Sequence, residues 1–261
     1  MTGFQTSDGM QYAPRGKPAP VCGPGDFPIA AVGLDHGHIY GQVNGLLEAG
    51  AELTWVYDPD AAKVDAFRRQ YPQARAARSL DEVLADPRVR LVAAAPVPCD
   101  RGPLGVRVME AGHDYFVDKS PFTTLDQLED ARRCAGATGR KYMVYYSERL
   151  HVECAVHAGE LIRAGAIGRV IQVIGLGPHR LNARNRPAWF FDKSKYGGIL
   201  CDIGSHQCEQ FLHYTGARAA TVTQARAVNL HHPEHPGLED FGDATLVADN
   251  GASFYFRVDW F

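Results

Sequence analysis

The sequence lacks the features that mark several broad classes of protein. No apolar run approaches the roughly 18 residues that span a bilayer, and no basic region followed by an unbroken apolar stretch begins the chain. We therefore expect a cytoplasmic protein with no membrane partner. There is no excess of positive charge either, because 27 lysines and arginines stand against 30 aspartates and glutamates. This balance disfavours a nucleic-acid partner.

Paired cysteines are also missing. None of the six cysteines forms a CxxC pair, which excludes a zinc ribbon and a dithiol redox motif. Residues 1–27 are rich in proline and glycine and have almost no apolar periodicity, so they predict an irregular extension that precedes the folded part of the chain.

Strand-like and helix-like segments then alternate strictly over residues 28–146. Short apolar runs predict strands at 28–33, 52–57, 90–95, 114–117 and 141–146. Helical spacing fills the intervals, and a capping box at Ser79 and Glu82 predicts the start of one helix. The alternation predicts an α/β fold with a doubly wound parallel sheet, a Rossmann domain over 28–146.

The pattern changes after Ser147. A helix to about Ala164 leads to expected strands at 169–175, 219–228, 243–247 and 252–261. In the last of these, one side holds four apolar residues, with Ser253, Arg257 and Asp259 opposite: Phe254, Phe256, Val258 and Trp260. Such alternation is typical of an antiparallel sheet with one buried face. We expect an α+β domain over 147–261 that binds substrate and joins copies of the chain into a homodimer or homotetramer.

The turn after the first predicted strand reads GLDHGHIYG from Gly33 to Gly41. Compared with the dinucleotide fingerprint GxGxxG, Asp35 and His38 replace the second and third glycines. A helix N-terminus after a strand still predicts an anion site, because its first amides lack partners. We expect a cofactor to contact five residues here, with Asp35 capping the helix or facing away from the phosphates: Gly33, Asp35, His36, Gly37 and His38.

Asp58 follows the second predicted strand, 25 residues after Gly33. An acidic side chain there can accept hydrogen bonds from both ribose hydroxyls, and it repels a 2′-phosphate. This favours NAD, with NADP less favoured, although Asp58 and Pro59 also fit a simple turn.

Two further groups carry candidate chemistry. Lys119 follows the fifth predicted strand, where it can bind a hydroxyl undergoing oxidation, or it can be a surface lysine before a turn. Asp202 and His206 are four residues apart, which on one helix would place both on the same face. They can converge on a substrate, with His206 as the base, or simply satisfy each other.

Three segments together resemble the glucose-fructose oxidoreductase and inositol dehydrogenase family, Gfo/Idh/MocA, over about residues 28–261. They are the strand, turn and helix from Ala30 to Gly41, the segment FVDKSP from Phe116 to Pro121, and the segment GGILCDIGSH from Gly197 to His206. The second is similar to the family's Glu-Lys-Pro motif, and the third to its Gly-Gly, Asp, Gly, His stretch. Their order and separation match as well.

The resemblance implies that Lys119 is the catalytic lysine, that His206 is the acid or base, and that Asp202 binds or orients the substrate. The implied substrate is a sugar, a polyol or a derivative, oxidised at a secondary alcohol. Asp118 replaces the family's glutamate beside the cofactor. Pro96 is expected near the adenosine or ribose. The chain is also shorter than is usual for the family, so we expect either an incomplete sequence or a shortened substrate domain.

Residues 184–191 resemble the family's substrate loop. Arg184 and Arg186 can donate to hydroxyls or carboxylates and Trp189 can stack on a sugar ring, or the tryptophan packs in the core while the arginines are solvated. Four residues of a later loop could in principle bind zinc, but flanking prolines favour a solvent loop, and we expect no metal: His231, His232, Glu234 and His235.

These observations favour a nicotinamide-dependent dehydrogenase that acts on a carbohydrate-like substrate. Two other functions stay open. One is a regulatory protein that senses a dinucleotide or a sugar without turnover, since Asp35 weakens the fingerprint. The other is a hydrolase or lyase that uses tightly held NAD transiently.

Overall fold

The structure is a computed structural model that describes residues 19–261, so most of the predicted N-terminal extension lies outside the described residues. The described chain divides into two compact units between Tyr145 and Tyr146. No helix within residues 19–261 is both long and apolar enough to cross a membrane.

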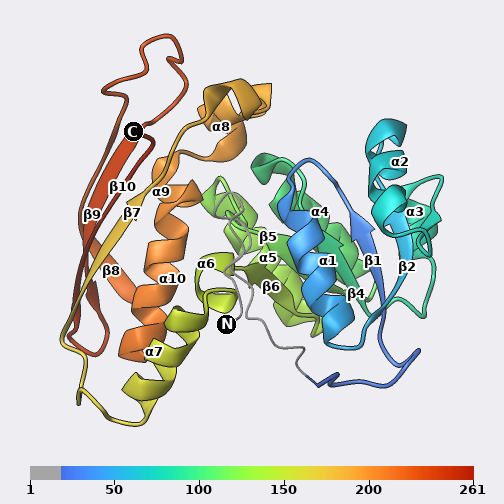
Figure 1. Ribbon diagram of the computed structural model, residues 1–261, viewed down its shortest axis with the longest axis horizontal. Helices are drawn as coiled ribbons and strands as arrows, with labels where there is room; N and C mark the ends of the chain where they lie inside the picture. The colour runs from blue at the N-terminus through green and yellow to red at the C-terminus, as the bar shows by residue number, and fades with distance from the viewer. Residues whose placement is uncertain (1–18) are drawn as a thin grey trace, which may run out of the picture. The chain divides into compact units, whose positions relative to one another are not determined.

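The first unit is built on a six-stranded parallel sheet with the order β3-β2-β1-β4-β5-β6 (Figure 1). Its strands are β1 (Pro28–Val32), β2 (Glu52–Tyr57), β3 (Arg75–Ala76), β4 (Leu91–Ala94), β5 (Asp114–Asp118) and β6 (Tyr142–Tyr145). The helices between them are α1 (His38–Glu48), α2 (Ala61–Gln70), α3 (Leu80–Leu84), α4 (Pro98–Glu110) and α5 (Leu125–Thr138). This order is that of the doubly wound dinucleotide-binding fold, and the predicted Rossmann class is confirmed.

Both faces of this sheet are covered. Successive residues of β1 point to opposite sides, so Ile29 packs with α1 residues Ile39 and Val43, whereas Ala30 packs in a second cluster with Val108 of α4. The central strands are therefore apolar throughout, as expected for parallel strands between two helical layers.

The predicted capping box is present with one change. Ser79 Oγ accepts the amide of Glu82, but the Glu82 carboxylate accepts the amide of Arg78 and not that of Ser79. The cap still starts α3 at Leu80.

The second unit combines short helices with a four-stranded sheet of order β7-β10-β9-β8. Its strands are β7 (Gln172–Pro178), β8 (Ala220–Val228), β9 (Phe241–Ala248) and β10 (Ser253–Asp259). Its helices are α6 (Ser147–Leu150), α7 (Glu153–Arg163), η1 (Ala183–Asn185), η2 (Ala188–Phe191), α8 (Lys193–Tyr196), α9 (Ile199–Asp202) and α10 (Gly204–Thr215). The sheet is mainly antiparallel, as predicted, although β7 runs parallel to β10.

One face of this sheet is buried against α10, which runs beside it in Figure 1. Phe211 of α10 stacks on Phe254 of β10 with ring centroids 4.5 Å apart. The predicted alternation in β10 is confirmed on its apolar side. The predicted alternation is wrong for Asp259, which is also buried. Its carboxylate can be buried because it pairs with Arg257 and accepts a hydrogen bond from the amide of Phe261.

Two predicted helical segments are interrupted. The helix expected from Ser147 to about Ala164 is two helices, because Val152 is extended and forms the N-terminal boundary of α7. The segment that holds Asp202 and His206 is also divided, since α9 ends at Asp202 and α10 begins at Gly204. A Cβ at Gly204 would lie 3.0 Å from the Phe256 ring, so glycine permits the close approach of α10 to the sheet.

Candidate functional site

The carboxyl edge of the parallel sheet gathers most of the residues that the sequence singled out. Strand order reverses between β1 and β4, and ligands of doubly wound folds bind at this switch point. Gly33, Asp58, Pro96 and Lys119 follow directly or closely on the ends of β1, β2, β4 and β5. The fold therefore places these four positions along one edge of the first unit.

The turn after β1 is bonded to both neighbouring strands. Gly33 donates to the Tyr57 carbonyl and accepts from the amide of Ala95, and its φ is +62°. A Cβ on Gly33 would lie 2.9 Å from the Pro96 side chain. Only glycine satisfies both the backbone angle and this contact, which fixes Pro96 against the turn.

Asp35, the residue that departs most from the glycine fingerprint, forms an ion pair. Its carboxylate lies 2.5 Å from Nζ of Lys63 on α2. Burial by itself lowers the pKa of Lys63, but the hydrogen bond and charge of Asp35 outweigh it and raise that pKa. The negative charge of Asp35 is thus balanced by a lysine of α2. The spacing of residues in the sequence did not indicate this contact.

Asp58 is buried and organises the same edge. Its carboxylate accepts the amide of Leu34 at 2.6 Å and the amide of Asp60 at 2.9 Å. Lys63 Nζ lies 3.9 Å from it. Each carboxylate oxygen has two acceptor sites, so these bonds orient Asp58 and still leave acceptor capacity for ribose hydroxyls.

The N-terminus of α1 fits an anionic ligand. Gly37 is the N-cap and provides no side-chain cap, and a Cβ built there would meet nothing within 4 Å. Backbone amides at such a terminus bind phosphate, and here the first of them, that of His38, donates to Nδ1 of His36 at 3.2 Å. Together with Asp58, this arrangement fits a dinucleotide whose phosphates approach the turn and whose ribose approaches the end of β2.

His36 and His38 of the same turn face Asp118 at the end of β5. Nδ1 of His38 lies 2.8 Å from Asp118 Oδ1, and Nδ1 of His36 lies 3.3 Å from Asp118 Oδ2. Burial lowers the pKa of His36 well below its ordinary value, and the neighbouring His38 lowers it further. Burial alone raises the pKa of Asp118, but His38, Arg101 and His36 together hold it well below its usual range.

Arg101 completes this cluster, and its role was not predicted. Its side chain is 1% exposed, and Nη2 donates to Asp118 Oδ2 at 3.0 Å. The only signal in the sequence is a charged residue shortly after the fully buried strand β4. Such a residue must find a partner at the sheet edge, because an unpaired charge in the interior is costly.

Lys119 follows Asp118 and is 7% exposed. Its carbonyl oxygen accepts a hydrogen bond from Arg101, and its peptide bond to Ser120 is cis. Because only 7% of Lys119 is exposed, the alternative of a solvated surface lysine is wrong. Lysine is seldom buried to this degree without a structural or chemical reason.

His36, His38 and Asp118 also have the residue types of a metal site, with ligand atoms within 4.8 Å of one another. The Arg101 guanidinium, however, is bonded to the same Asp118 carboxylate. A divalent ion there would be repelled by this buried cation, so we interpret the group as a hydrogen-bonded ion-pair network.

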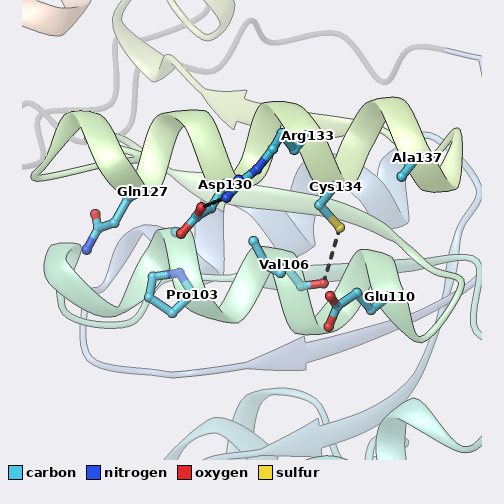
Figure 2. A pocket seen from close by; sticks show the side chains of 9 residues that line it. Pro103, Val106, Glu110, Gln127, Asp130, Arg133, Cys134 and Ala137 are labelled. Carbon is cyan, nitrogen blue, oxygen red and sulfur yellow. Dashed lines mark hydrogen bonds and ion pairs between the residues drawn. The ribbon is translucent and has the colours of Figure 1, made fainter.

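A separate groove of the first unit lies between α4 and α5 (Figure 2). Figure 2 shows Pro103 and Val106 on one side and Asp130 and Arg133 on the other, with the Cys134 thiol directed at the Val106 carbonyl 3.7 Å away. Arg133 is ion-paired to Asp130 on its own helix. None of the predicted site residues lines this groove.

In the second unit, Asp202 and His206 are both buried, 7% and 3% exposed, on the adjoining helices α9 and α10. The His206 ring meets the Tyr146 ring edge-on with centroids 5.9 Å apart. Burial raises the pKa of Tyr146, so its hydroxyl stays protonated at neutral pH. The unit thus holds a buried carboxylate and a buried imidazole on adjoining helices, with a phenol ring against the imidazole.

The predicted substrate residues lie in different surroundings. Arg184 is exposed on η1, whereas the guanidinium of Arg186 lies over the rings of Phe190 and Trp260, 4.5 and 4.8 Å from their centroids. Burial lowers the pKa of Arg186, and the charge of Asp202 partly opposes this. Trp189 is half-buried against the core of the unit.

The histidine-rich loop is organised by a buried carboxylate. Asp240 accepts the amides of Leu230 and His231, and lies 3.0 Å from Nδ1 of His232. The ring of His235 stacks on Phe191. These contacts give the loop a structural explanation that needs no metal.

Two family models match the chain. One, described as an oxidoreductase family with an NAD-binding Rossmann fold, matches residues 27–146, and one for the GFO/IDH/MocA C-terminal domain matches residues 155–261. The chain belongs to the Gfo/Idh/MocA oxidoreductase family. The resemblance inferred from three short segments is thereby confirmed.

Similar proteins include solved structures and a curated dehydrogenase. An oxidoreductase structure from Erwinia carotovora atroseptica SCRI1043 is 49% identical with a TM-score of 0.87, covering 90% of this chain and 70% of that one. GenD2 from gentamicin A biosynthesis, solved with NAD, is 25% identical with a TM-score of 0.78, covering 95% of this chain and 68% of that one. The NAD⁺-dependent scyllo-inositol 2-dehydrogenase of Bacillus subtilis is 27% identical over 78% of this chain and 58% of that enzyme. The chain spans about half the length of the curated relatives it matches.

Proposed function

We propose that this protein catalyses reversible hydride transfer between NAD and a secondary alcohol carbon of a sugar, a polyol or a derivative. The observation that carries the proposal is Lys119, a nearly buried lysine at the carboxyl edge of an NAD-binding Rossmann unit. Its place immediately after β5 is where the fold presents side chains to a bound dinucleotide. The relative named scyllo-inositol 2-dehydrogenase supports a polyol substrate.

Residues of the first unit are proposed to hold the cofactor. Gly33 and Gly37 admit the phosphates to the N-terminus of α1, and Asp58 accepts from the ribose hydroxyls. When bound, NAD supplies the acceptor for the hydride that leaves the alcohol carbon. We favour NAD over NADP because the Asp58 carboxylate would repel a 2′-phosphate.

The same reasoning assigns the turn histidines and Pro96. His36, His38 and Asp118 would border the cofactor from the turn and from β5, while Pro96 would lie beside the adenosine or ribose. Asp35 would contact the cofactor only through the turn, since its charge is paired with Lys63.

Oxidation of an alcohol also releases the hydroxyl proton, which a general base must accept. We propose that Lys119 donates a hydrogen bond to the reacting oxygen and that His206 accepts the proton, with Asp202 orienting the substrate or the imidazole. Histidine suits this role because its ordinary pKa lies close to working pH. Arg184, Arg186 and Trp189 would bind the remainder of the substrate through hydrogen bonds and ring stacking.

We also propose that the open face of the four-stranded sheet joins copies of the chain. Its exposed apolar residues come from three of the four strands: Ile174, Leu176, Val247 and Tyr255. An exposed apolar face of this kind commonly forms an isologous dimer contact.

The test is to follow the absorbance of reduced cofactor while the protein is mixed with NAD⁺ and each member of a panel of sugars and polyols. We expect at least one to be oxidised with stoichiometric formation of NADH. A protein that binds NAD⁺ tightly but reduces it with no member of a broad panel would instead fit a sensor. Product formed without net NADH would indicate a lyase or hydrolase.

A further inference from the structure

The guanidinium of Arg101 connects the ends of two strands at the candidate cofactor edge. Nε donates to the carbonyl of Pro96, which follows β4, at 2.8 Å. Nη1 donates to the carbonyls of Lys119 and Ser120, which follow β5. Nη2 donates to Asp118 at 3.0 Å. One planar cation thus binds four acceptors at the ends of two strands, β4 and β5.

Arg101 is itself fixed on its backbone side. The hydroxyl of Tyr115 donates to the Arg101 carbonyl at 3.1 Å, and that of Tyr142 lies 3.4 Å from the same oxygen. Both tyrosines belong to the sheet, on β5 and β6. The first turn of α4 is therefore tied to the sheet, and the guanidinium has a rigid support.

The geometry uses properties that only arginine has. Its five N–H donors point in fixed directions in one plane, whereas lysine offers a point charge on a flexible chain. Three of the four acceptors are neutral backbone carbonyls, so neutralising Asp118 accounts for only part of the arrangement. Two of these carbonyls belong to consecutive peptide units, Lys119–Ser120 and Ser120–Pro121.

We propose that Arg101 is a positioning residue for Lys119: by holding the Lys119 and Ser120 carbonyls against the Pro96 loop, it fixes where the lysine side chain leaves the backbone. The inference rests on the proposed function in that Lys119 is taken as the group that acts on the substrate. It matters for rate because displacements of about 1 Å at a reacting group can lower turnover about 100-fold.

A simpler role would be to neutralise the buried Asp118 carboxylate, and a double variant separates the two roles. Asp118→Asn removes the carboxylate charge, and Arg101→Gln in that background then removes the guanidinium charge together with its bonds to the three carbonyls, so that no carboxylate charge is left unpaired. We expect the Tm of the double variant to lie within a few degrees of that of Asp118→Asn. We expect its kcat to be lower than that of Asp118→Asn by a factor of about ten or more. A kcat within twofold of Asp118→Asn would overturn the inference.

Arg107→Gln is the matched control. Arg107 lies on the same helix but is exposed, and it pairs with Asp81, which is also exposed. Exposed pairs contribute little to stability. This variant is expected to keep wild-type kcat, which shows that loss of a cation from α4 is not sufficient.

A second readout does not depend on activity. Trace acetylation with acetic anhydride, quantified by mass spectrometry of the peptide that contains Lys119, measures how accessible and how fixed its amine is. The exposed Lys141 provides an internal reference in the same unit. We expect Lys119 to react at least about fivefold faster relative to Lys141 in Arg101→Gln/Asp118→Asn than in Asp118→Asn.

Equal labelling of Lys119 in the two variants would contradict the inference and leave the proposed dehydrogenase activity intact. Conversely, the wild-type protein could fail to reduce NAD⁺ with every sugar and polyol of the panel. In that case increased labelling of Lys119 would still support its positioning by Arg101. Failure of the positioning inference and failure of the proposed dehydrogenase activity therefore give different results.

Discussion

Nζ of Lys63 lies 2.5 Å from the carboxylate of Asp35, and this ion pair joins helix α2 to the turn after β1. It explains how an aspartate can occupy a turn that would bind a diphosphate. The positive partner cancels the charge that would otherwise repel the ligand, so the departure from the glycine fingerprint does not argue against dinucleotide binding.

Removing this partner should weaken NAD⁺ binding. In Lys63→Ala the Asp35 charge is uncompensated, and because both side chains are partly exposed we expect the Kd for NAD⁺ to rise only about three- to fivefold. Calorimetric titration at low and moderate salt checks this. Lys63→Ala/Asp35→Asn should recover most of the loss, and a double variant no better than Lys63→Ala would contradict the explanation.

Asp58 should determine the choice between the two dinucleotides. Replacing it with serine removes the carboxylate that would accept from both ribose hydroxyls and the charge that repels a 2′-phosphate, while Lys63 stays nearby. We expect the ratio of Kd for NADP⁺ to Kd for NAD⁺ to fall by about tenfold or more. Asp60→Ser, which changes an acidic residue in the same loop, is the control. An unchanged ratio in Asp58→Ser would place the ribose elsewhere.

Asp118 should make stability depend on pH. The pKa of an aspartate in an unfolded chain is about 3.9, and that of Asp118 in the folded protein is held lower by its cationic neighbours. Its contribution is therefore complete above about pH 4 and is lost as the pH falls through that value toward the folded pKa. We expect the Tm of wild type to exceed that of Asp118→Asn at pH 7, with the gap narrowing below about pH 4. A gap that stays constant from pH 7 to pH 3 would refute this assignment.

Charges on the open sheet face should separate copies of the chain. Ile174 and Tyr255 are paired neighbours on β7 and β10, 64% and 38% exposed. Ile174→Lys and Tyr255→Lys should each reduce the mass measured by light scattering to that of a monomer, since a buried unpaired ammonium is costly. Ile167→Lys, at an exposed position outside the strands, should leave the mass unchanged. A wild-type protein that is monomeric at high concentration would exclude this contact.

Much of the fold follows from the sequence because its signals are local. The central strands are apolar on both faces, the helices between them show clear periodicity, and three of those five helices have side-chain caps, so alternation and fold class are evident. β3 was missed because its two residues, Arg75 and Ala76, are exposed and are paired only to β2. A strand defined by one neighbour's backbone leaves almost no trace in side-chain pattern.

The interruption between Asp202 and His206 was missed for a related reason. Spacing of four residues predicts one helical face only if the helix is continuous. The division at Ile203 accompanies the contact of Gly204 with Phe256, about fifty residues further along the chain. Local periodicity does not contain such a contact.

The residues of the candidate site also differ in whether a local sequence signal identifies them. Asp58, Asp118 and Lys119 could be found because each ends or directly follows a strand whose end lies at the ligand-binding edge. Arg101 and Lys63 could not be assigned, because their roles depend on partners 17 and 28 residues away in sequence. An arginine shortly after a buried strand is a usable signal only once the strand order is known.

The most direct test of the account is the turnover of Lys119→Met and His206→Ala with NAD⁺ and whichever polyol or sugar the wild-type protein oxidises. The account predicts that each variant folds and still binds NAD⁺, and that each kcat falls by about 100-fold or more, the range expected when a positioned proton-transfer group is removed. Near-normal turnover in both variants would contradict it.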